Sequence, residues 1–356
     1  MTQKDTTKRC GQRMAADLVA DDAVKLTPLK PLDLGKVKNF DDLTRQMADT
    51  AFGARAVGEA TDILHKMVID KDCFVVLTLS GAMTVAKMGL LVCDMIDNNM
   101  VSAVVSTGAI MAHGFIEAVG MRHFKVSPEM DDREMYYKGF DRVYDTLELE
   151  KNLDNVDIIL ENILKTVDED KTLSSFLINE LLGKYLSEQT EGRGILKSAY
   201  KKKVPVFVPA FTDSELGLNM AIHNKKRRLN NKKELTFNPL LDLDQFTELI
   251  NRQKTLGIFT VGGGVPRNWA QQVGPYLDIT EKSLPGQGGF KRYKYGVRIC
   301  PEPVHWGGLS GCTYSEGVSW GKFIPPKDGG RWSEVYSDAT IAWPIILKAA
   351  MERMEK

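Results

Sequence analysis

A single lysine near the end of the chain stands among small residues and a tryptophan, in the run Ser319-Trp320-Gly321-Lys322. An amine that is desolvated beside an aromatic ring has its charged form disfavoured, so its pKa falls. A neutral amine of this kind can attack a carbonyl or imine carbon and form a covalent intermediate. Lys322 is therefore a candidate nucleophile, although a surface lysine that follows a turn would show the same spacing.

Three short loops of small residues each follow an apolar run. They are Ser80-Gly81, Ser106-Thr107-Gly108 and Gly262-Gly263-Gly264. Where such a loop leads into a helix, backbone amides and the positive end of the helix dipole favour a phosphate. Consecutive glycines allow backbone contact that a side chain would block. None of these loops is a G-x-G-x-x-G fingerprint, so tight turns made for packing are an alternative to nucleotide binding.

The elements that must position these groups alternate along the chain. Short apolar runs predict strands near residues 74–79, 101–106, 204–208, 257–261 and 295–299. Helical spacing of apolar residues occurs most clearly at 41–70, 85–95, 155–166, 173–187, 244–253 and 340–353. This alternation indicates an α/β fold with a doubly wound, Rossmann-like parallel sheet and helices on both faces. Such folds bind ligands beyond the carboxyl ends of their strands.

Length and composition bound the class of protein. The chain has 356 residues, of which 43% are hydrophobic, and 47 lysines and arginines balance 47 aspartates and glutamates. We expect an N-terminal extension over residues 1–36 that is partly ordered, followed by one catalytic domain over 37–356. The balanced charge gives no overall attraction to nucleic acid or to an anionic membrane, and no apolar stretch approaches the roughly 20 residues of a bilayer span.

Cysteine usage and one basic stretch refine these expectations. Five cysteines without a C-x-x-C pair suit a reducing cytoplasm, and we expect no metal site. The basic stretch from His223 to Lys233 resembles a nucleic-acid patch but has no interleaved aromatic residue. We expect a solvated loop there.

The run that ends in Lys322 resembles the catalytic segment of the deoxyhypusine synthase family. Further segments in that family's order extend the resemblance over about residues 40–350: Asn99-Met100-Val101, Val105-Ser106-Thr107-Gly108, and residues 205–213, 261–265 and 335–340. The resemblance implies an NAD cofactor, with binding residues Ser106, Thr107, Gly108, Asp213, Ser310, Gly311, Asp338 and Ala339. Asp213 and Asp338 could also be helix N-caps, because each opens a helical pattern, and capping can coexist with ligand binding.

The same resemblance implies that Lys322 is catalytic and that the substrate contacts His113, Asn268, Glu316 and Trp320. His113 could also be an ordinary core histidine that is satisfied by the backbone. Glu316 and Trp320 agree with the family pattern, whereas His113 and Asn268 stand where that pattern has other residues.

Several carboxylates of the family's polyamine clamp are missing. Ala112 and His113 occupy the places of two adjacent glutamates, and Leu218 occupies that of an aspartate. Three explanations are open: relocated carboxylates such as Glu117 or Glu215, a smaller or differently charged substrate, or lost activity.

The activity that the resemblance implies is NAD-dependent transfer of an aminoalkyl (aminobutyl) group from a polyamine such as spermidine. NAD would remove hydride beside a secondary amine, Lys322 would capture the resulting imine, and an acceptor amine would displace the lysine before the same NADH reduced the product. The acceptor could be a protein lysine or, as in homospermidine synthase, a free diamine. A non-catalytic subunit that supports an active paralogue is the alternative of another class. The resemblance also implies a homotetramer with active sites at subunit interfaces.

Overall fold

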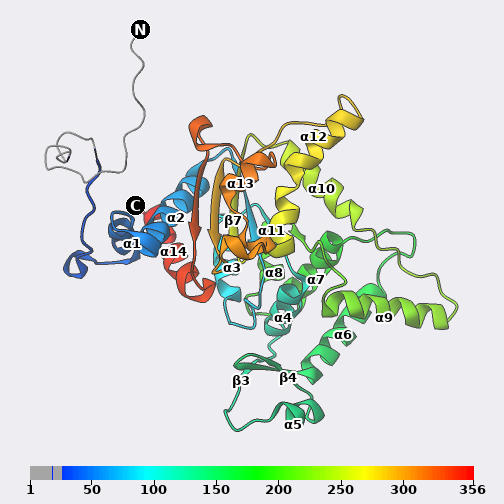
Figure 1. The fold of residues 1–356 in the computed structure, drawn as a ribbon. Coiled ribbons are helices and arrows are strands. Elements are labelled where there is room, and N and C mark those ends of the chain that lie inside the picture. Colours follow the sequence, from blue (N-terminus) through cyan, green and yellow to red (C-terminus); the bar gives the residue numbers. More distant parts are fainter. Residues whose placement is uncertain (1–17, 19–25) are drawn as a thin grey trace.

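Six parallel strands form the central sheet of the protein (Figure 1). The structure is a computed structural model and describes residue 18 and residues 26–356. In spatial order the strands are β6 (Val206–Phe207), β2 (Ala103–Ser106), β1 (Cys73–Leu79), β7 (Thr255–Val261), β8 (Tyr295–Ile299) and β9 (Arg331–Val335). Each neighbouring pair is parallel. The doubly wound α/β fold expected from the sequence is confirmed.

Strand β1 shows why helices cover both faces of the sheet. Its residues Val75, Leu77 and Leu79 pack into one hydrophobic core, while Val76 packs into a second core on the opposite face. Successive side chains of a strand point to opposite faces, so a strand that is apolar at every position needs cover on both. The first core is closed mainly by α2 (Phe52–Ile69), α3 (Gly89–Asp97), α4 (Gly108–Ala118) and α14 (Ala339–Met354), and the second by α10 (Leu240–Asn251), α11 (Gly264–Gln271) and α12 (Val273–Ser283).

The winding direction of the sheet reverses between β1 and β7. From β1 the chain builds β2 and β6 on one side, and it then returns to build β7, β8 and β9 on the other. Strands β1 and β7 pair from Cys73 opposite Thr255 to Leu79 opposite Val261. The loops that follow these two strands therefore begin side by side. Doubly wound proteins bind ligands at such a reversal.

The remaining helices occupy most of the predicted helical regions, with two changes of boundary. The pattern at 41–70 is two helices, because the chain turns between them and Phe52 has a left-handed φ of 56°. The helix expected at 85–95 begins only at Gly89. The other helices are α1 (Phe40–Ala48), α5 (Asp132–Tyr137), α6 (Glu150–Leu164), α7 (Ser175–Gln189), α8 (Ile195–Lys202), α9 (Glu215–Leu229) and α13 (Tyr314–Ser319), with short 3-10 turns at Leu34–Lys36, Val304–Trp306, Leu309–Gly311 and Pro326–Asp328.

A small antiparallel sheet, absent from the sequence-based expectation, projects from the lower side of the main domain in Figure 1. Its strands are β3 (Phe124–Lys125), β5 (Thr146–Leu149) and β4 (Phe140–Val143), in that spatial order. Each strand has at most four residues, and β3 and β4 are largely exposed, so the hydrophobic alternation is too short to detect. Strand β9 was missed for a related reason: it is an edge strand in which only Ser333 and Val335 are buried, so it has no apolar run.

The basic stretch is not the solvated loop that we expected. Lys226, Arg227 and Arg228 lie in the last turn of α9, where cations favour the helix dipole. Lys226 pairs with Glu161 at 2.6 Å, and Arg227 pairs with Glu169. These basic charges therefore have acidic partners within the fold.

Most of the expected N-terminal extension, residues 1–17 and 19–25, lies outside the described residues. From residue 26 the chain runs along α1, where the Lys30 amide donates to the Asp49 carbonyl at 3.0 Å. The division at residue 36 stays a prediction. Within the described part of the chain, no helix combines the length and apolar character that crossing a bilayer requires.

Asp41, in the first turn of α1, binds the C-terminal helix to the domain. Its buried carboxylate accepts from Arg353 Nε at 2.7 Å and from Lys356 Nζ at 2.8 Å. Burial alone would raise the pKa of Asp41, but the hydrogen bonds from Lys356 and Arg353 prevail and lower it from 3.8 to about 2. The ionised carboxylate therefore stabilises the fold above about pH 4, and this contribution is lost as pH falls towards 2.

We predict that Asp41→Asn lowers the free energy of unfolding at pH 7 by about 3 kcal/mol, because Arg353 stays buried with less compensation. Urea unfolding followed by circular dichroism measures this. The difference between the variant and the unaltered protein should narrow below pH 4. Asp72→Asn, which removes an exposed pair with Lys254, is the matched control and should leave unfolding unchanged. Equal midpoints for Asp41→Asn and the unaltered protein would contradict the prediction.

Candidate active site

Lys322 is positioned by the end of helix α13. Gly321 follows the helix cap with a left-handed φ of 68°, and its amide donates to the Val318 carbonyl at 3.0 Å. The Lys322 amide donates to the Gly317 carbonyl at 2.9 Å. This pair of bonds is a Schellman motif, which commonly needs glycine at its left-handed position. The glycine between Trp320 and Lys322 thus turns the chain so that the lysine leaves the helix axis.

The Lys322 amine lies in a cavity of about 220 Å³ between α11 and α13. Its Nζ donates to Asn268 Oδ1 at 2.8 Å and lies 5.8 Å from the centre of the Trp320 ring. Burial lowers the pKa of Lys322, and the nearby Arg267 guanidinium lowers it further, while Cys312 and Glu316 oppose the shift. Three predicted substrate residues, Asn268, Glu316 and Trp320, line this cavity with Lys322.

Arg267 is a component of this site that the sequence reasoning missed. It is only 2% exposed, and its guanidinium lies 5.2 Å from the centre of the Tyr314 ring. Nη1 makes one long bond to the Ser310 carbonyl at 3.5 Å, and Nε has no hydrogen-bond partner in the described part of the chain. A buried cation with so few hydrogen-bond partners interacts strongly with neighbouring charges, because the local dielectric is low. The available signal was an arginine directly before Asn268 in an otherwise weakly charged helix.

A second buried arginine holds the loop over the cavity. Arg298 of β8 donates to the Cys312 carbonyl at 3.1 Å and also to the Ser310 carbonyl. Arg298 Nη2 lies 3.3 Å from Glu334 Oε2 on β9, and Glu334 Oε1 accepts a hydrogen bond from the Tyr314 amide. The side chain of Arg298 is 1% exposed. Both ends of the segment 310–314 are therefore anchored to adjacent strands.

The triple glycine meets Ser80 and Ser310 at the reversal of the sheet. The Gly263 amide donates to Ser80 Oγ at 2.7 Å. A Cβ on Gly263 would lie 2.6 Å from Ser310 Cα, and one on Gly262 would lie 2.3 Å from Ser80 Oγ. Packing therefore explains why these two positions are glycine. Gly262 and Gly264 both have a left-handed φ, of 81° and 61°, but a Cβ on Gly264 would approach nothing nearer than Ser310 Oγ at 3.9 Å. Its backbone faces open space at the start of α11.

The loop after β2 carries a buried hydroxyl, that of Thr107, without a hydrogen-bond partner in the described part of the chain. Gly108 begins α4 against Ser214, whose Oγ would lie 2.3 Å from a Cβ on that glycine. Thr107 Oγ1 is buried and has no partner among the described residues, as is true of Glu215 Oε2. A buried hydroxyl that the protein itself leaves unsatisfied is expected to bind something else.

The two aspartates behave differently as helix caps. Asp338 caps α14 by accepting from the Thr340 amide at 2.7 Å, so the capping alternative is correct there. It also precedes Ala339, at the carboxyl end of β9. Asp213 is exposed and is not a cap, because the N-cap of α9 is Ser214, which accepts from the Gly217 amide. Gly311, another predicted cofactor residue, is buried in the 3-10 turn Leu309–Gly311.

His113 does not line the Lys322 cavity in this chain. It lies on α4, where its Nδ1 is 3.2 Å from Glu148 Oε2, so its partner is a carboxylate rather than the backbone. Glu117, one proposed replacement for the missing carboxylates, already pairs with Lys87 and His123.

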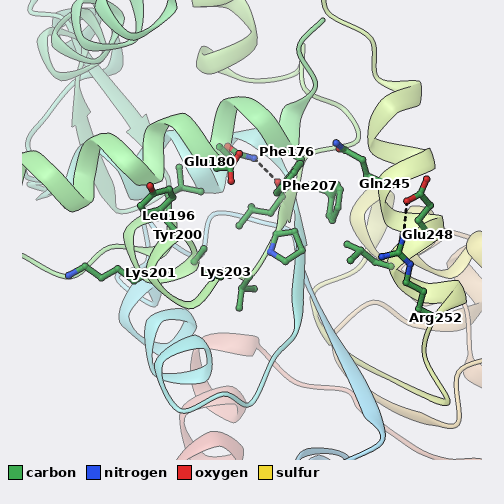
Figure 2. A pocket seen from close by; sticks show the side chains of 16 residues that line it. Phe176, Glu180, Leu196, Tyr200, Lys201, Lys203, Phe207, Gln245, Glu248 and Arg252 are labelled. Atoms are coloured by element: carbon green, nitrogen blue, oxygen red, sulfur yellow. Dashed lines mark hydrogen bonds and ion pairs between the residues drawn. The ribbon is translucent and has the colours of Figure 1, made fainter. Parts of the chain in front are cut away.

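A larger cavity of about 710 Å³ lies beside β6, an edge strand of the sheet (Figure 2). Its floor includes Phe176, Phe207 and Leu196, and its rim carries Glu180 and Arg252. None of the predicted site residues lines it. Size alone therefore does not identify the site of chemistry.

These observations define a class: a doubly wound α/β protein with a half-buried lysine next to the loops of its sheet reversal. A sequence profile described as deoxyhypusine synthase matches residues 42–350. The chain belongs to the deoxyhypusine synthase family.

Curated relatives match over nearly their whole length. "Probable deoxyhypusine synthase 2" of Methanosarcina acetivorans is 34% identical over 327 residues, covering 92% of this chain and 90% of that protein. "Deoxyhypusine synthase-like protein" of Chlorobaculum parvum is 34% identical over 321 residues, covering 90% and 88%. A solved structure of a deoxyhypusine synthase candidate from Entamoeba histolytica has a TM-score of 0.58 at 15% identity, covering 91% of this chain and 97% of that one, and it shares the fold.

We predict that Lys322 reacts as an amine at lower pH than exposed lysines. Competitive acetylation followed by mass spectrometry measures this without any substrate. Arg267→Gln should shift the Lys322 titration to higher pH, because it removes a neighbouring cation, and Glu316→Gln should shift it to lower pH. Arg252→Gln, at the exposed C-cap of α10, is the control. Shifts in the same direction for both site variants would contradict the assignment.

Proposed function

We propose that the protein is a deoxyhypusine synthase-like, NAD-dependent transferase that moves an aminoalkyl group from a polyamine through an imine on Lys322. The observation that carries this proposal is the Lys322 amine, half-buried, hydrogen-bonded to a neutral amide and placed near a buried arginine. This setting favours the neutral amine, which is the form that reacts.

The loops at the sheet reversal fit a dinucleotide. Residues that would hold NAD are Ser80, Gly81, Ser106, Thr107, Gly108, Asp213, Gly262, Gly263, Gly264, Ser310, Gly311, Asp338 and Ala339. The start of α4 offers helix amides for a phosphate, and the unpartnered Thr107 hydroxyl offers one more polar contact. When bound, NAD would take up and return one hydride, which allows an unactivated C–N bond to be exchanged without net oxidation.

Lys322 carries the covalent step in this proposal. Its neutral amine adds to the imine carbon of the oxidised donor, and the donor's own nitrogen leaves with a proton as the released amine. The aminoalkyl fragment is then held as an imine on Nζ. An acceptor amine adds to the same carbon and displaces Lys322. Asn268 positions Nζ through its Oδ1, and Trp320 covers one side of the amine.

The charges of the cavity indicate how an amine substrate would lie. Arg267 disfavours a second cation close to Lys322, whereas Glu316 on the outer side attracts one. A polyamine would therefore place its reacting, uncharged carbon inward and an ammonium towards Glu316 and the Trp320 face. Glu215 has a buried oxygen without a partner in the described residues and remains the better replacement for the lost carboxylates.

The assembly and location follow the same proposal. We propose a homotetramer with active sites shared between subunits, acting in the cytoplasm on a polyamine and on either a protein lysine or a free diamine as acceptor. His113 would reach a substrate only from another subunit, because it lies outside the Lys322 cavity of its own chain.

We predict that Lys322→Arg abolishes transfer and that borohydride, added with NAD and labelled spermidine, fixes label on Lys322 of the unaltered protein. Arginine keeps the charge but forms no imine under these conditions. Lys327→Arg, at an exposed position nearby, is the control and should leave labelling unchanged. Parallel reactions with putrescine test a free diamine as acceptor. Full transfer activity in Lys322→Arg would refute the imine mechanism, and no labelling or transfer with any amine would favour the non-catalytic alternative.

We predict that Thr107→Val weakens NAD binding about fivefold while leaving the thermal midpoint unchanged or raised. The hydroxyl has no partner within the described residues, so its loss costs the fold no hydrogen bond, whereas a bond to ligand is worth about 1 kcal/mol. Calorimetric titration and thermal melting measure the two effects.

Thr78→Val is the matched control for this experiment. Thr78 Oγ1 is buried and bonds Thr260 Oγ1 at 2.8 Å, so the same substitution should lower stability without a comparable effect on NAD. Unchanged NAD affinity in Thr107→Val would remove this threonine from the cofactor site.

A further inference from the structure

A second cluster of polar side chains joins the small antiparallel sheet to α4. It consists of His113 on α4, His123 just before β3, and Glu148 on β5. Glu148 Oε2 lies 3.2 Å from His113 Nδ1 and 2.6 Å from His123 Nε2. Ligand-type atoms of all three residues lie within 4.8 Å of one another. The side chains of His123 and Glu148 are 0% and 1% exposed, and that of His113 is 14% exposed.

The His123 ring nitrogen that faces this cluster is not satisfied by the protein. Nε2 is close to Glu148 Oε2, yet it makes no hydrogen bond of acceptable geometry to any described residue. Proximity without alignment leaves a buried polar atom aimed into the cluster. Such an atom requires a partner, and an ion is one candidate.

The surroundings orient the three residues as a ligand set. Glu148 Oε1 accepts from Asn152 Nδ2 at 2.7 Å and from the Leu149 amide at 3.0 Å, which leaves Oε2 for the cluster. On the far side of the His123 ring, Nδ1 lies 3.4 Å from Glu117 Oε1. A metal-binding histidine commonly gives its other N–H to a carboxylate, and a metal-binding carboxylate is itself hydrogen-bonded.

We propose that His113, His123 and Glu148 bind one divalent transition-metal ion, with Zn²⁺ as the ion to test. Two imidazoles and one carboxylate are a known zinc set, which leaves a fourth position open. Tetrahedral Zn²⁺ with bonds of about 2.0–2.1 Å places its ligand atoms about 3.3 Å apart. The His113–Glu148 separation of 3.2 Å already fits, and His123 must withdraw slightly from its 2.6 Å contact.

Lys87 is the competitor for this site. Its Nζ lies 2.9 Å from His123 Nδ1 and also pairs with Glu117. Metal binding at Nε2 requires a proton on Nδ1, so Lys87 must give up the histidine and keep Glu117. With neutral histidines, Glu117, Glu148 and Lys87 leave one net negative charge around the cluster, which favours a cation.

The ligands come from three segments, so a bound ion would tie the small sheet to the main domain. Residues 119–149 otherwise contribute little to the central core: their buried apolar side chains, Leu147 and Met135, belong to neither main cluster, and only the partly buried Val119 and Met121 pack against the first. Metal binding should therefore raise the thermal midpoint of the whole protein.

The test uses untagged, full-length protein stripped with a chelator and titrated with ZnCl₂ against a chromophoric competitor. We expect one Zn²⁺ per chain and a raised thermal midpoint. His113→Ala and Glu148→Gln should each weaken binding at least tenfold. Lys87→Asn should tighten binding, because it removes the cation that competes for His123. Asparagine is chosen because it accepts the left-handed φ of 64° at position 87. His65→Gln, on α2 and outside the cluster, is the control.

Two further measurements keep the test decisive. Circular dichroism checks that each variant is folded, and His113, the most exposed ligand, is the least disruptive to change. Co²⁺ in place of zinc should give a visible spectrum typical of nitrogen and oxygen ligands without thiolate bands. The proposal fails if the unaltered protein binds no stoichiometric Zn²⁺ at micromolar concentrations, or if folded His113→Ala and Glu148→Gln variants bind it as tightly. In that case the cluster is a hydrogen-bonded histidine–carboxylate network only.

Discussion

The pairing of β1 with β7 is the constraint on which the rest of this structure depends. The two strands run side by side over all 7 residues of β1, although each residue and its partner, such as Leu79 and Val261, are 182 positions apart in the chain. This pairing ends both strands at one level and brings Ser80 against Gly262 and Gly263. Ser310 then packs on Gly263, and through Ser310 the loop that leads to α13 is placed. The position of Lys322, which follows α13, thus depends on a strand pair at the centre of the sheet.

Buried positive charge is the second organising feature. Arg298 spans from β8 to the 310–314 segment and is compensated by Glu334 and by carbonyl groups. Arg267 has much weaker compensation and faces the same cavity as Lys322. Since burial disfavours every uncompensated cation, the lysine is the group that can lose its proton. The poorly compensated charge of Arg267 therefore lowers the pKa of Lys322 and favours the reactivity proposed for that lysine.

The structure shows what the carboxylates nearest to the missing amine-clamp positions contact instead. Glu117 and Glu148 lie close to the changed positions, but both are occupied by histidines and by Lys87 or Asn152. His113 is therefore part of a compact cluster rather than a bare substitute for a glutamate. Under the proposed function, Glu316 at the Lys322 cavity and Glu215 beside the loop after β2 are the candidate partners for an amine.

The sequence alone determined the class of fold and the family, and it predicted Lys322 as the central chemical group. Buried parallel strands are apolar at nearly every position, so β1, β7 and β8 were visible in the sequence, and the order of motifs around Lys322 indicated the family. Short or exposed strands carry too few buried residues for such a signal, which is why β9 and the small sheet were missed.

Only the tertiary structure decided which charges act on Lys322 and which glycines are free. Arg267 is adjacent to Asn268 in sequence, yet nothing local shows that its side chain is buried beneath Tyr314. Gly262, Gly263 and Gly264 look alike in sequence, but Ser80 and Ser310 occupy the space beside the first two and leave the third open. His113, His123 and Glu148 meet from three segments. Burial and contact between distant residues depend on how the chain packs, and residue type and spacing do not contain that information.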